Sequence, residues 1–444
     1  MEEIKRIVKQ THEDYKVFAK NIENIQNEGI GKLENVWNKV QSFSKKIIPK
    51  SIEDVNKHCT KDGKNMEQLF LDLVKSHTKQ FKNMYEVDLH HIETQDGYIL
   101  SCFRLENTEV SGQDTKPAVL LQHGLCDNSF SWVINGIENA LAYQLADAGY
   151  QVYMNNTRMN GVSMKHKTFS RHSNYVWKFG FQHMAAFDIP AVVNYITETT
   201  GLETISYVGH SQGTTQMFAN LCLKEEKRSV AAKINCYIAL APVLFVGKVN
   251  QIALKSMAKI KFDDLLLKTG LYIFSPTADI QRKLVQPFMK NKLIKKGSVS
   301  FVDFFEGSTM DPEMLPVYTK YLGAPTSIYN LRSWANGIRT GKFLKYDYGK
   351  KQNQVVYKQK DPVEYDLESL KNCGVPIYLY SGSKDILADP KDVKQLELTL
   401  DNCCMDHRIT KHYGHLDYTL GSTVKEELYG EIVVTLNQYN GIFD

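Results

Sequence analysis

No apolar run in the 444-residue sequence is long enough to cross a bilayer. The longest such run, residues 236–246, is interrupted by Pro242 and predicts a buried strand. The chain opens with Met-Glu-Glu-Ile-Lys-Arg, which has acidic residues where a secretory or mitochondrial leader lacks them, and its last four residues match no lipidation or retention motif. We therefore expect an intracellular protein, either cytoplasmic or peripheral to a membrane, without a transmembrane segment.

Metal-binding patterns are also lacking. The eight cysteines include no C-x-x-C pair, and no H-E-x-x-H motif occurs. His90 and His91 are adjacent on a predicted strand, where neighbouring side chains point to opposite faces. We therefore expect structural histidines, cysteines that serve as small buried apolar residues in a reducing compartment, and neither a metal nor another cofactor.

The sequence has little excess charge of either sign. Its net charge of +4 is too low to indicate a nucleic-acid partner, and none is expected. The charge is unevenly distributed, because residues 247–372 carry 21 Lys and Arg against 12 Asp and Glu. This basic segment suits contact with an anionic membrane or lipid droplet, and it equally suits a solvated basic face, so both interpretations stay open.

Residues 1–84 show a helical pattern with a single proline. Apolar residues recur at intervals of three and four in three stripes, which begin at Ile4, Leu33 and Met66. A helix with one apolar stripe must cover that stripe. We therefore expect an extra helical N-terminal region that packs against the rest of the protein, against a protein partner or second copy, or against a lipid surface.

From Tyr85 onward, strands alternate with helices. Two alternating strands flank the hairpin signal at residues 95–97. Further strands are expected at residues 118–122, 150–154, 205–208, 234–246, 375–380 and 407–411, and helices at residues 137–148, 184–199, 390–400 and 424–439. Because the later strands are almost wholly apolar, we predict an α/β fold with a mainly parallel central sheet and helices on both faces.

Residues 247–372 interrupt this alternation. They are rich in aromatic residues and contain helical pieces near 265–267, 301–305 and 331–343. An insertion between two sheet strands lies over the carboxyl ends of the strands, where α/β sheets bind ligands. We therefore predict a core of residues 85–246 and 373–444 and an inserted helical cap of residues 247–372.

One short motif carries chemistry, the sequence Gly209-His-Ser211-Gln-Gly213 after an apolar strand and before a helical segment. This G-x-S-x-G pattern between strand and helix is typical of a nucleophile elbow. Gly209 and Gly213 lack a Cβ atom, so strand and helix can pass closely while the Ser211 hydroxyl projects from a strained turn. A bare G-x-S-x-G also occurs by chance, so a base, an acid and an oxyanion hole must accompany it.

A serine hydroxyl needs a base to remove its proton, and the base needs an orienting carboxylate. In proteins with this elbow the acid and then the histidine follow the serine. Asp385 and His415 each follow a predicted strand, so we expect both at the same sheet edge as Ser211. Four neighbours compete for these roles: Asp389, Asp417, His412 and His210. We disfavour Asp389 because it suits a helix start, His412 because it should belong to the strand, and His210 because it lies inside the elbow.

The tetrahedral intermediate of acyl transfer needs two backbone N–H donors. One is expected from Gln212, the residue after the serine. The other is expected from Leu125, in the loop that follows the strand at residues 118–122. Gly124 would let an acyl group approach this loop closely.

The chain resembles the acid lipase family of α/β-hydrolases, which includes gastric lipase, lysosomal acid lipase and steryl ester hydrolases. The resemblance extends over residues 85–444 and rests on residues 93–100, 122–125, 145–150, 209–213, 333–343 and 387–390. It implies an α/β-hydrolase fold with a lid-bearing cap, a triad of Ser211, Asp385 and His415, and long-chain acyl esters as substrates. The cap differs from that of secreted relatives because no cysteine occurs between Cys236 and Cys373.

These patterns predict a serine hydrolase that cleaves lipid esters, such as triacylglycerols or steryl esters, through an acyl-enzyme. Two alternatives stay open. One is acyl transfer to another alcohol by the same triad, and the other is a non-catalytic subunit docked into an assembly by residues 1–84.

Overall fold

The computed structural model describes the chain from residue 60 to residue 442, with several gaps. The described residues are 60–61, 64–79, 84–110, 116–224, 228–250, 252–259, 261–268, 270, 272–275 and 309–442. The first two apolar stripes, any partner contact of residues 1–59, and the helical piece near 301–305 lie outside these residues.

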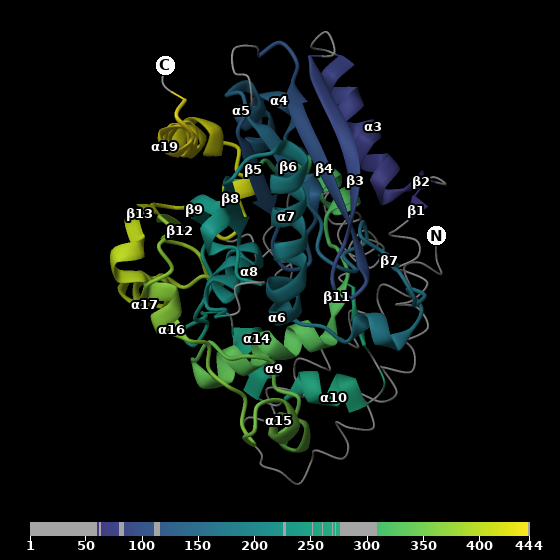
Figure 1. The fold of residues 1–444 in the computed structure, drawn as a ribbon, viewed down its shortest axis with the longest axis vertical. Coiled ribbons are helices and arrows are strands. Elements are labelled where there is room, and N and C mark those ends of the chain that lie inside the picture. Colours follow the sequence, from purple (N-terminus) through teal and green to yellow (C-terminus); the bar gives the residue numbers. More distant parts are fainter. Residues whose placement is uncertain are drawn as a thin grey trace, which may run out of the picture.

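A nine-stranded sheet forms the centre of the described chain (Figure 1). Its strands are β3 (Tyr85–Glu93), β4 (Tyr98–Asn107), β5 (Ala118–Gln122), β6 (Gln151–Asn155), β7 (Lys165–His166), β8 (Ile205–His210), β9 (Ile234–Leu240), β12 (Ile377–Gly382) and β13 (Cys404–Thr410). The order across the sheet is β13-β12-β9-β8-β5-β6-β4-β3, with β7 beside β4. All pairs from β13 to β6 are parallel, whereas β3, β4 and β7 pair antiparallel.

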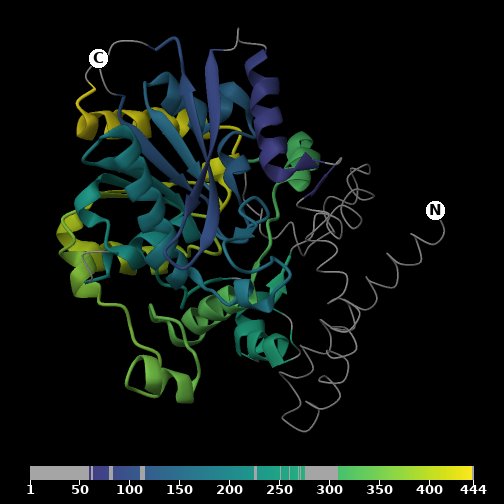
Figure 2. The same cartoon turned by 45° about the vertical axis from the view of Figure 1, so that its right-hand side comes forward.

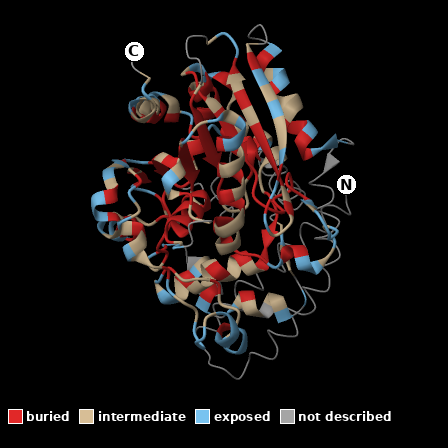
Figure 3. Cartoon of the chain, viewed as in Figure 1, coloured by how far each residue is buried: buried red, intermediate tan, exposed pale blue. Residues whose placement is uncertain are grey.

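Helices cover both faces of the sheet. One face packs against α7 (Ile189–Thr200), α8 (Gln212–Leu221), α16 (Leu367–Lys371) and α17 (Pro390–Leu400). The other packs against α3 (Met66–Thr78), α5 (Leu141–Asp147) and α19 (Gly430–Asn440). Every residue of β5 and β8 is buried between these layers, as Figure 3 shows. The predicted α/β architecture with a mainly parallel sheet is therefore confirmed.

Several predicted boundaries were wrong for local reasons. The strand expected at residues 234–246 ends at Leu240, because Ala241 adopts φ 45° and a proline follows it. The expected helix at residues 137–148 is two helices, α4 (Gly136–Asn139) and α5, because Ala140 is extended. The helix expected at residues 184–199 is present, and its first turn, Met184–Asp188, is π-helical and joins the short helix α6 (Phe181–His183) to α7.

The third apolar stripe, on α3, packs against the sheet. Phe70 stacks on Phe103 of β4 with ring centroids 3.9 Å apart, and its edge meets the Phe130 ring at 5.1 Å. Glu67 of the same helix accepts a hydrogen bond from the Ser101 hydroxyl over 2.7 Å. Of the three surfaces that could cover an N-terminal apolar stripe, the rest of the protein is therefore the one that covers this stripe.

The described part of residues 247–372 is largely helical, and most of its helices lie at the lower end of Figure 1. Its α-helices are α9 (Ile252–Lys259), α10 (Phe262–Lys268), α13 (Leu315–Tyr321), α14 (Ile328–Thr340), α15 (Lys350–Val356) and α16, the last of which packs on the sheet. The pieces expected near 265–267 and 331–343 correspond to α10 and α14. Among the described helices, none combines the length and apolar character that a bilayer crossing requires.

Candidate active site

Ser211 stands at the turn between β8 and α8 with φ 53° and ψ −120°, a backbone conformation that costs free energy for a residue with a side chain. A Cβ atom on Gly213 would lie 2.2 Å from the carbonyl oxygen of Gln122, and one on Gly209 would lie 2.9 Å from the Thr214 nitrogen. Both glycines are therefore required for the close passage of strand and helix that the motif predicts.

The structure brings Ser211, His415 and Asp385 together. Nε2 of His415 lies 2.6 Å from Oγ of Ser211, and Nδ1 of His415 lies 2.8 Å from Oδ2 of Asp385. The carboxylate can only accept, so Nδ1 carries the proton and Nε2 is free to accept the serine proton. Asp385 follows β12 and His415 follows β13, so both reach Ser211 from the carboxyl ends of parallel strands.

Asp385 is buried and fully hydrogen-bonded. Its Oδ1 accepts from the backbone N–H groups of Leu387 and Ala388 over 2.9 and 2.8 Å. Burial alone raises the pKa of this carboxyl, but the adjacent His415 and these hydrogen bonds outweigh burial and leave the pKa below its ordinary value. Asp385 is therefore an ionised carboxylate placed where it can stabilise a protonated His415.

Two side chains that the sequence did not favour as members of the triad hold the backbone around His415. Nε2 of His210 donates to the His415 carbonyl oxygen over 2.8 Å, and burial lowers the pKa of His210 to about 3, so its ring is neutral. Oδ2 of Asp417 accepts from the Gly414 N–H over 2.6 Å, and its Oδ1 accepts from the backbone N–H and hydroxyl of Thr309. The loop that carries His415 is thus bound on both sides.

The other two disfavoured neighbours lie apart from Ser211. Asp389 caps α17 by accepting a hydrogen bond from the Lys391 N–H over 2.9 Å, as expected for a helix start. His412 was expected within the last strand, and this was wrong. β13 ends at Thr410, and His412 adopts φ 61° in the turn that follows.

Gln212 begins α8 and is held by helix α14. Its side-chain oxygen accepts hydrogen bonds from Nδ2 of Asn330 over 2.7 Å and Nε1 of Trp334 over 2.8 Å. Both donors belong to α14. Sequence reasoning missed these two residues as part of the site, although Trp334 lies in a stretch that resembles the acid lipases.

The loop after β5 passes close to the serine. A Cβ atom on Gly124 would lie 3.0 Å from the Ser211 Cβ, so Gly124 is needed for this approach. His123 anchors the loop, because Nδ1 donates to the Gly124 carbonyl and Nε2 accepts from the Thr157 N–H over 3.1 Å. Burial lowers the pKa of His123 to about 4, which keeps the ring neutral. Leu125, the expected second N–H donor, follows directly and is half-buried.

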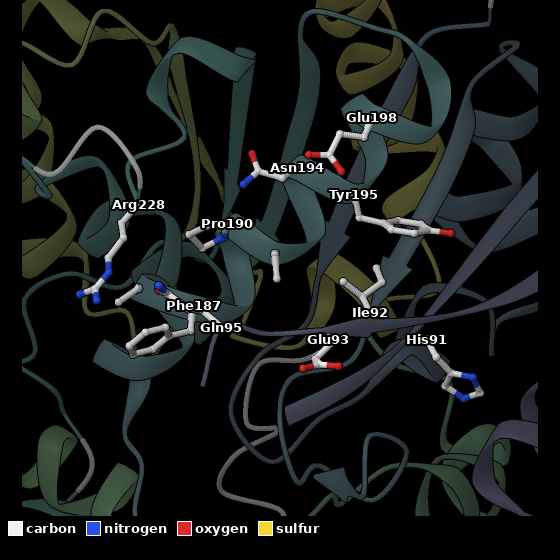
Figure 4. Close-up of a pocket in the computed structure, with 12 residues that line it drawn as sticks. His91, Ile92, Glu93, Gln95, Phe187, Pro190, Asn194, Tyr195, Glu198 and Arg228 are labelled. Atoms are coloured by element: carbon white, nitrogen blue, oxygen red, sulfur yellow. The ribbon is translucent and has the colours of Figure 1, made fainter. Parts of the chain in front are cut away.

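A cavity of about 530 Å³ lies elsewhere, between β3 and α7 (Figure 4). Its lining includes His91, Glu93, Tyr195 and Arg228, but none of the three residues that meet at Ser211. The cavity is therefore separate from the serine. No group of three or more His, Cys, Asp or Glu residues within the described ranges could hold a metal ion.

Comparisons with known proteins agree with this geometry. Residues 117–271 match the α/β hydrolase fold, and residues 81–136 match the partial α/β-hydrolase lipase region, so the fold is that of the α/β-hydrolases. Human lipase member K is 33% identical over 361 residues, covering 80% of this chain and 88% of the relative. Gastric triacylglycerol lipase of Rattus norvegicus is 35% identical over 357 residues, covering 79% and 88%. The chain therefore belongs to the lipase family of α/β-hydrolases.

Proposed function

We propose that this chain is a serine hydrolase that cleaves carboxylic esters of lipids, with Ser211 as nucleophile, His415 as general base and Asp385 as its orienting carboxylate. The observation that carries the proposal is the continuous hydrogen-bonded row from the Ser211 hydroxyl through both nitrogens of His415 to Asp385. A serine held this way by a neutral imidazole is activated for attack on an acyl carbon.

In the first half-reaction, Ser211 Oγ bonds to the ester carbonyl carbon while its proton moves to Nε2 of His415. The bond from the acyl carbon to the alcohol oxygen then breaks, and the alcohol leaves with the proton from His415. In the second half-reaction, water gives a proton to His415 and attacks the acyl carbon. The free acid departs, and Ser211 regains its proton.

The negative oxygen of each tetrahedral intermediate needs donors that are already in position. We assign these to the backbone N–H groups of Gln212 and Leu125. The position of Gln212 at the start of α8 supports its assignment, because N–H groups at a helix start have no intrahelical partner. The approach of Gly124 to Ser211 supports the assignment of Leu125.

The proposed substrates are long-chain acyl esters, triacylglycerols or steryl esters among them. Similarity to gastric triacylglycerol lipases over most of their length supports this class. The basic composition of residues 247–372 supports peripheral contact with a lipid surface, where such esters accumulate.

The test compares the full chain with Ser211→Ala on esters of increasing acyl length. We expect hydrolysis by the wild type, a fall in kcat of about six orders of magnitude in Ser211→Ala, and labelling of the wild type alone by a fluorophosphonate. Ser76→Ala, on the exposed side of α3, is the control and should match the wild type. A wild type that neither reacts with the probe nor hydrolyses any ester would refute the proposal. Activity confined to short, soluble esters would support an esterase and contradict the assignment as a lipase.

A further inference from the structure

Residues 346–362 form an excursion from the cap that we call the α15 loop. The chain leaves and returns through a short antiparallel neck, where Lys345 N–H donates to the Val363 carbonyl over 2.7 Å and Tyr365 N–H donates to the Phe343 carbonyl over 2.9 Å. Figures 1 and 2 show α15 projecting from the lower end of the molecule, away from the sheet.

The α15 loop has a built interior. Asn353, which is fully buried, accepts a hydrogen bond from the Tyr348 N–H over 2.9 Å. Its Nδ2 donates to Asp347 over 2.7 Å and to the Lys360 carbonyl over 3.0 Å. The Tyr357 hydroxyl donates to the Tyr346 carbonyl over 2.8 Å. These bonds join both ends of the loop, so its outward side chains keep a defined arrangement.

The outward side chains are basic and apolar. Between Tyr348 and Lys360 the sequence has four lysines and no Asp or Glu. All four are exposed, namely Lys350, Lys351, Lys358 and Lys360. Val355 and Val356 beside them are 61% and 46% exposed, and Figure 3 shows α15 largely in the colour of exposed residues. Three carboxylates lie close by. Asp347 accepts from Asn353 and Glu364 pairs with Lys342, whereas Asp361 is exposed beside Lys360, so residues 346–362 carry four lysines against two aspartates and a net charge of +2.

We propose that the α15 loop binds an anionic phospholipid surface through these lysines and valines. Such a surface presents phosphate and carboxylate charge directly above an apolar interior, so one protruding tip can satisfy both kinds of side chain at once. Nucleic acid offers the charge without an apolar phase. The contact deepens the proposed function and rests on it for its biological purpose, because lipid esters reside in such surfaces, but the binding itself needs no catalysis.

The experiment measures co-sedimentation of the full-length chain, as wild type and as Ser211→Ala, with vesicles of phosphatidylcholine alone or enriched in phosphatidylserine. We expect binding that requires phosphatidylserine, weakens with salt and is equal for both proteins. Loss of one lysine at such a surface weakens binding about fivefold, so Lys350→Glu with Lys351→Glu should weaken it about twentyfold or more. Val355→Ser with Val356→Ser should weaken the vesicle binding that remains at high salt.

The matched control is Lys391→Glu with Lys394→Glu, two lysines on α17, which covers a face of the sheet. We expect it to bind like the wild type. The proposal would be overturned if the wild type failed to bind phosphatidylserine vesicles or bound neutral vesicles equally well. It would also be overturned if the control lost as much binding as the α15 variants, or if the α15 variants bound like the wild type. Vesicle binding by a chain that hydrolyses no ester would refute the proposed function alone.

Discussion

The indole N–H of Trp334 donates a hydrogen bond to the side-chain oxygen of Gln212 over 2.8 Å, which joins cap helix α14 to the first residue of the elbow helix. Gln212 is the residue whose backbone N–H we assign to the oxyanion site. The cap therefore contacts the residue that would position a reacting oxygen.

Trp334→Phe keeps an aromatic ring, but it removes this donor and part of the indole volume. Because a neutral hydrogen bond contributes about 0.5–1.5 kcal/mol, we expect kcat/KM for a short, soluble ester to fall about two- to tenfold. The thermal unfolding temperature should also fall, because the smaller ring leaves space where the indole packs against the core. Tyr329→Phe, on the same helix, is the control and should leave kcat/KM unchanged. Equal losses in the two variants would mean that α14 acts through general packing.

Asp385→Asn should reduce kcat by about four orders of magnitude, because an amide no longer selects the Nδ1–H form of His415. Ester hydrolysis at neutral pH measures this loss. Asp389→Asn, which changes a carboxylate that caps α17 instead, provides the comparison and should retain most of the activity. Similar losses in both would indicate a general charge effect.

The Asp385 carboxyl should also make the stability of the folded protein depend on pH. Its pKa in the folded protein lies below the ordinary value of 3.8. The unfolded chain therefore binds the proton more readily, and this contribution to stability is present above about pH 4 and lost as the pH falls through the folded pKa. Urea unfolding between neutral and acid pH should show a smaller loss in Asp385→Asn. An equal loss in both proteins would contradict the assignment.

His210→Phe removes the hydrogen bond to the His415 carbonyl. A displacement of a catalytic group by about 1 Å can reduce the rate about a hundredfold, so we expect kcat to fall between about ten- and a hundredfold. Because burial lowers the pKa of His210 to about 3, its ring stays neutral across the working range. The acid limb of the pH–rate profile should therefore keep its midpoint. A shifted midpoint would show that His210 itself titrates in the reaction.

Gly213→Ala would bring a Cβ atom to 2.2 Å from the Gln122 carbonyl oxygen, so we expect a loss of stability of more than about 4 kcal/mol or failure to fold. Gly430→Ala is the matched control, because no atom lies within 4 Å of the added Cβ at this helical position. It should be neutral or stabilise by up to about 1 kcal/mol. Urea unfolding compares them, and similar free energies of unfolding would contradict the close packing at the elbow.

Local patterns predicted most of the site. The glycines around Ser211 mark the elbow within five residues, and Asp385 and His415 could be placed because the carboxyl ends of parallel strands meet at one edge. The structure brings these three side chains together as the order rule requires. Their catalytic roles stay predictions for the experiments above.

Contacts between residues far apart in the chain could not be predicted from the sequence. Asn330 lies 118 positions from the residue it binds, and no periodicity indicates that its amide turns toward Gln212. The strand that ends at Leu240 and the turn at His412 show a second limit. In both places a residue other than glycine adopts a positive φ angle close to the strand end, and apolar runs carry no sign of this.

The stacking of Phe70 on Phe103 sets a minimum length for a shortened form of this enzyme. Tyr85 begins the first strand of the main sheet, so a truncated form could be designed to begin there. A chain cut there would uncover Phe103 and one side of Phe130, which keeps its stacking on Tyr321, at up to about 1.5–3 kcal/mol for a ring that becomes fully exposed. It would also leave an apolar patch open to aggregation. Any active truncation should therefore retain α3 from Met66, together with its capping residue Asn65.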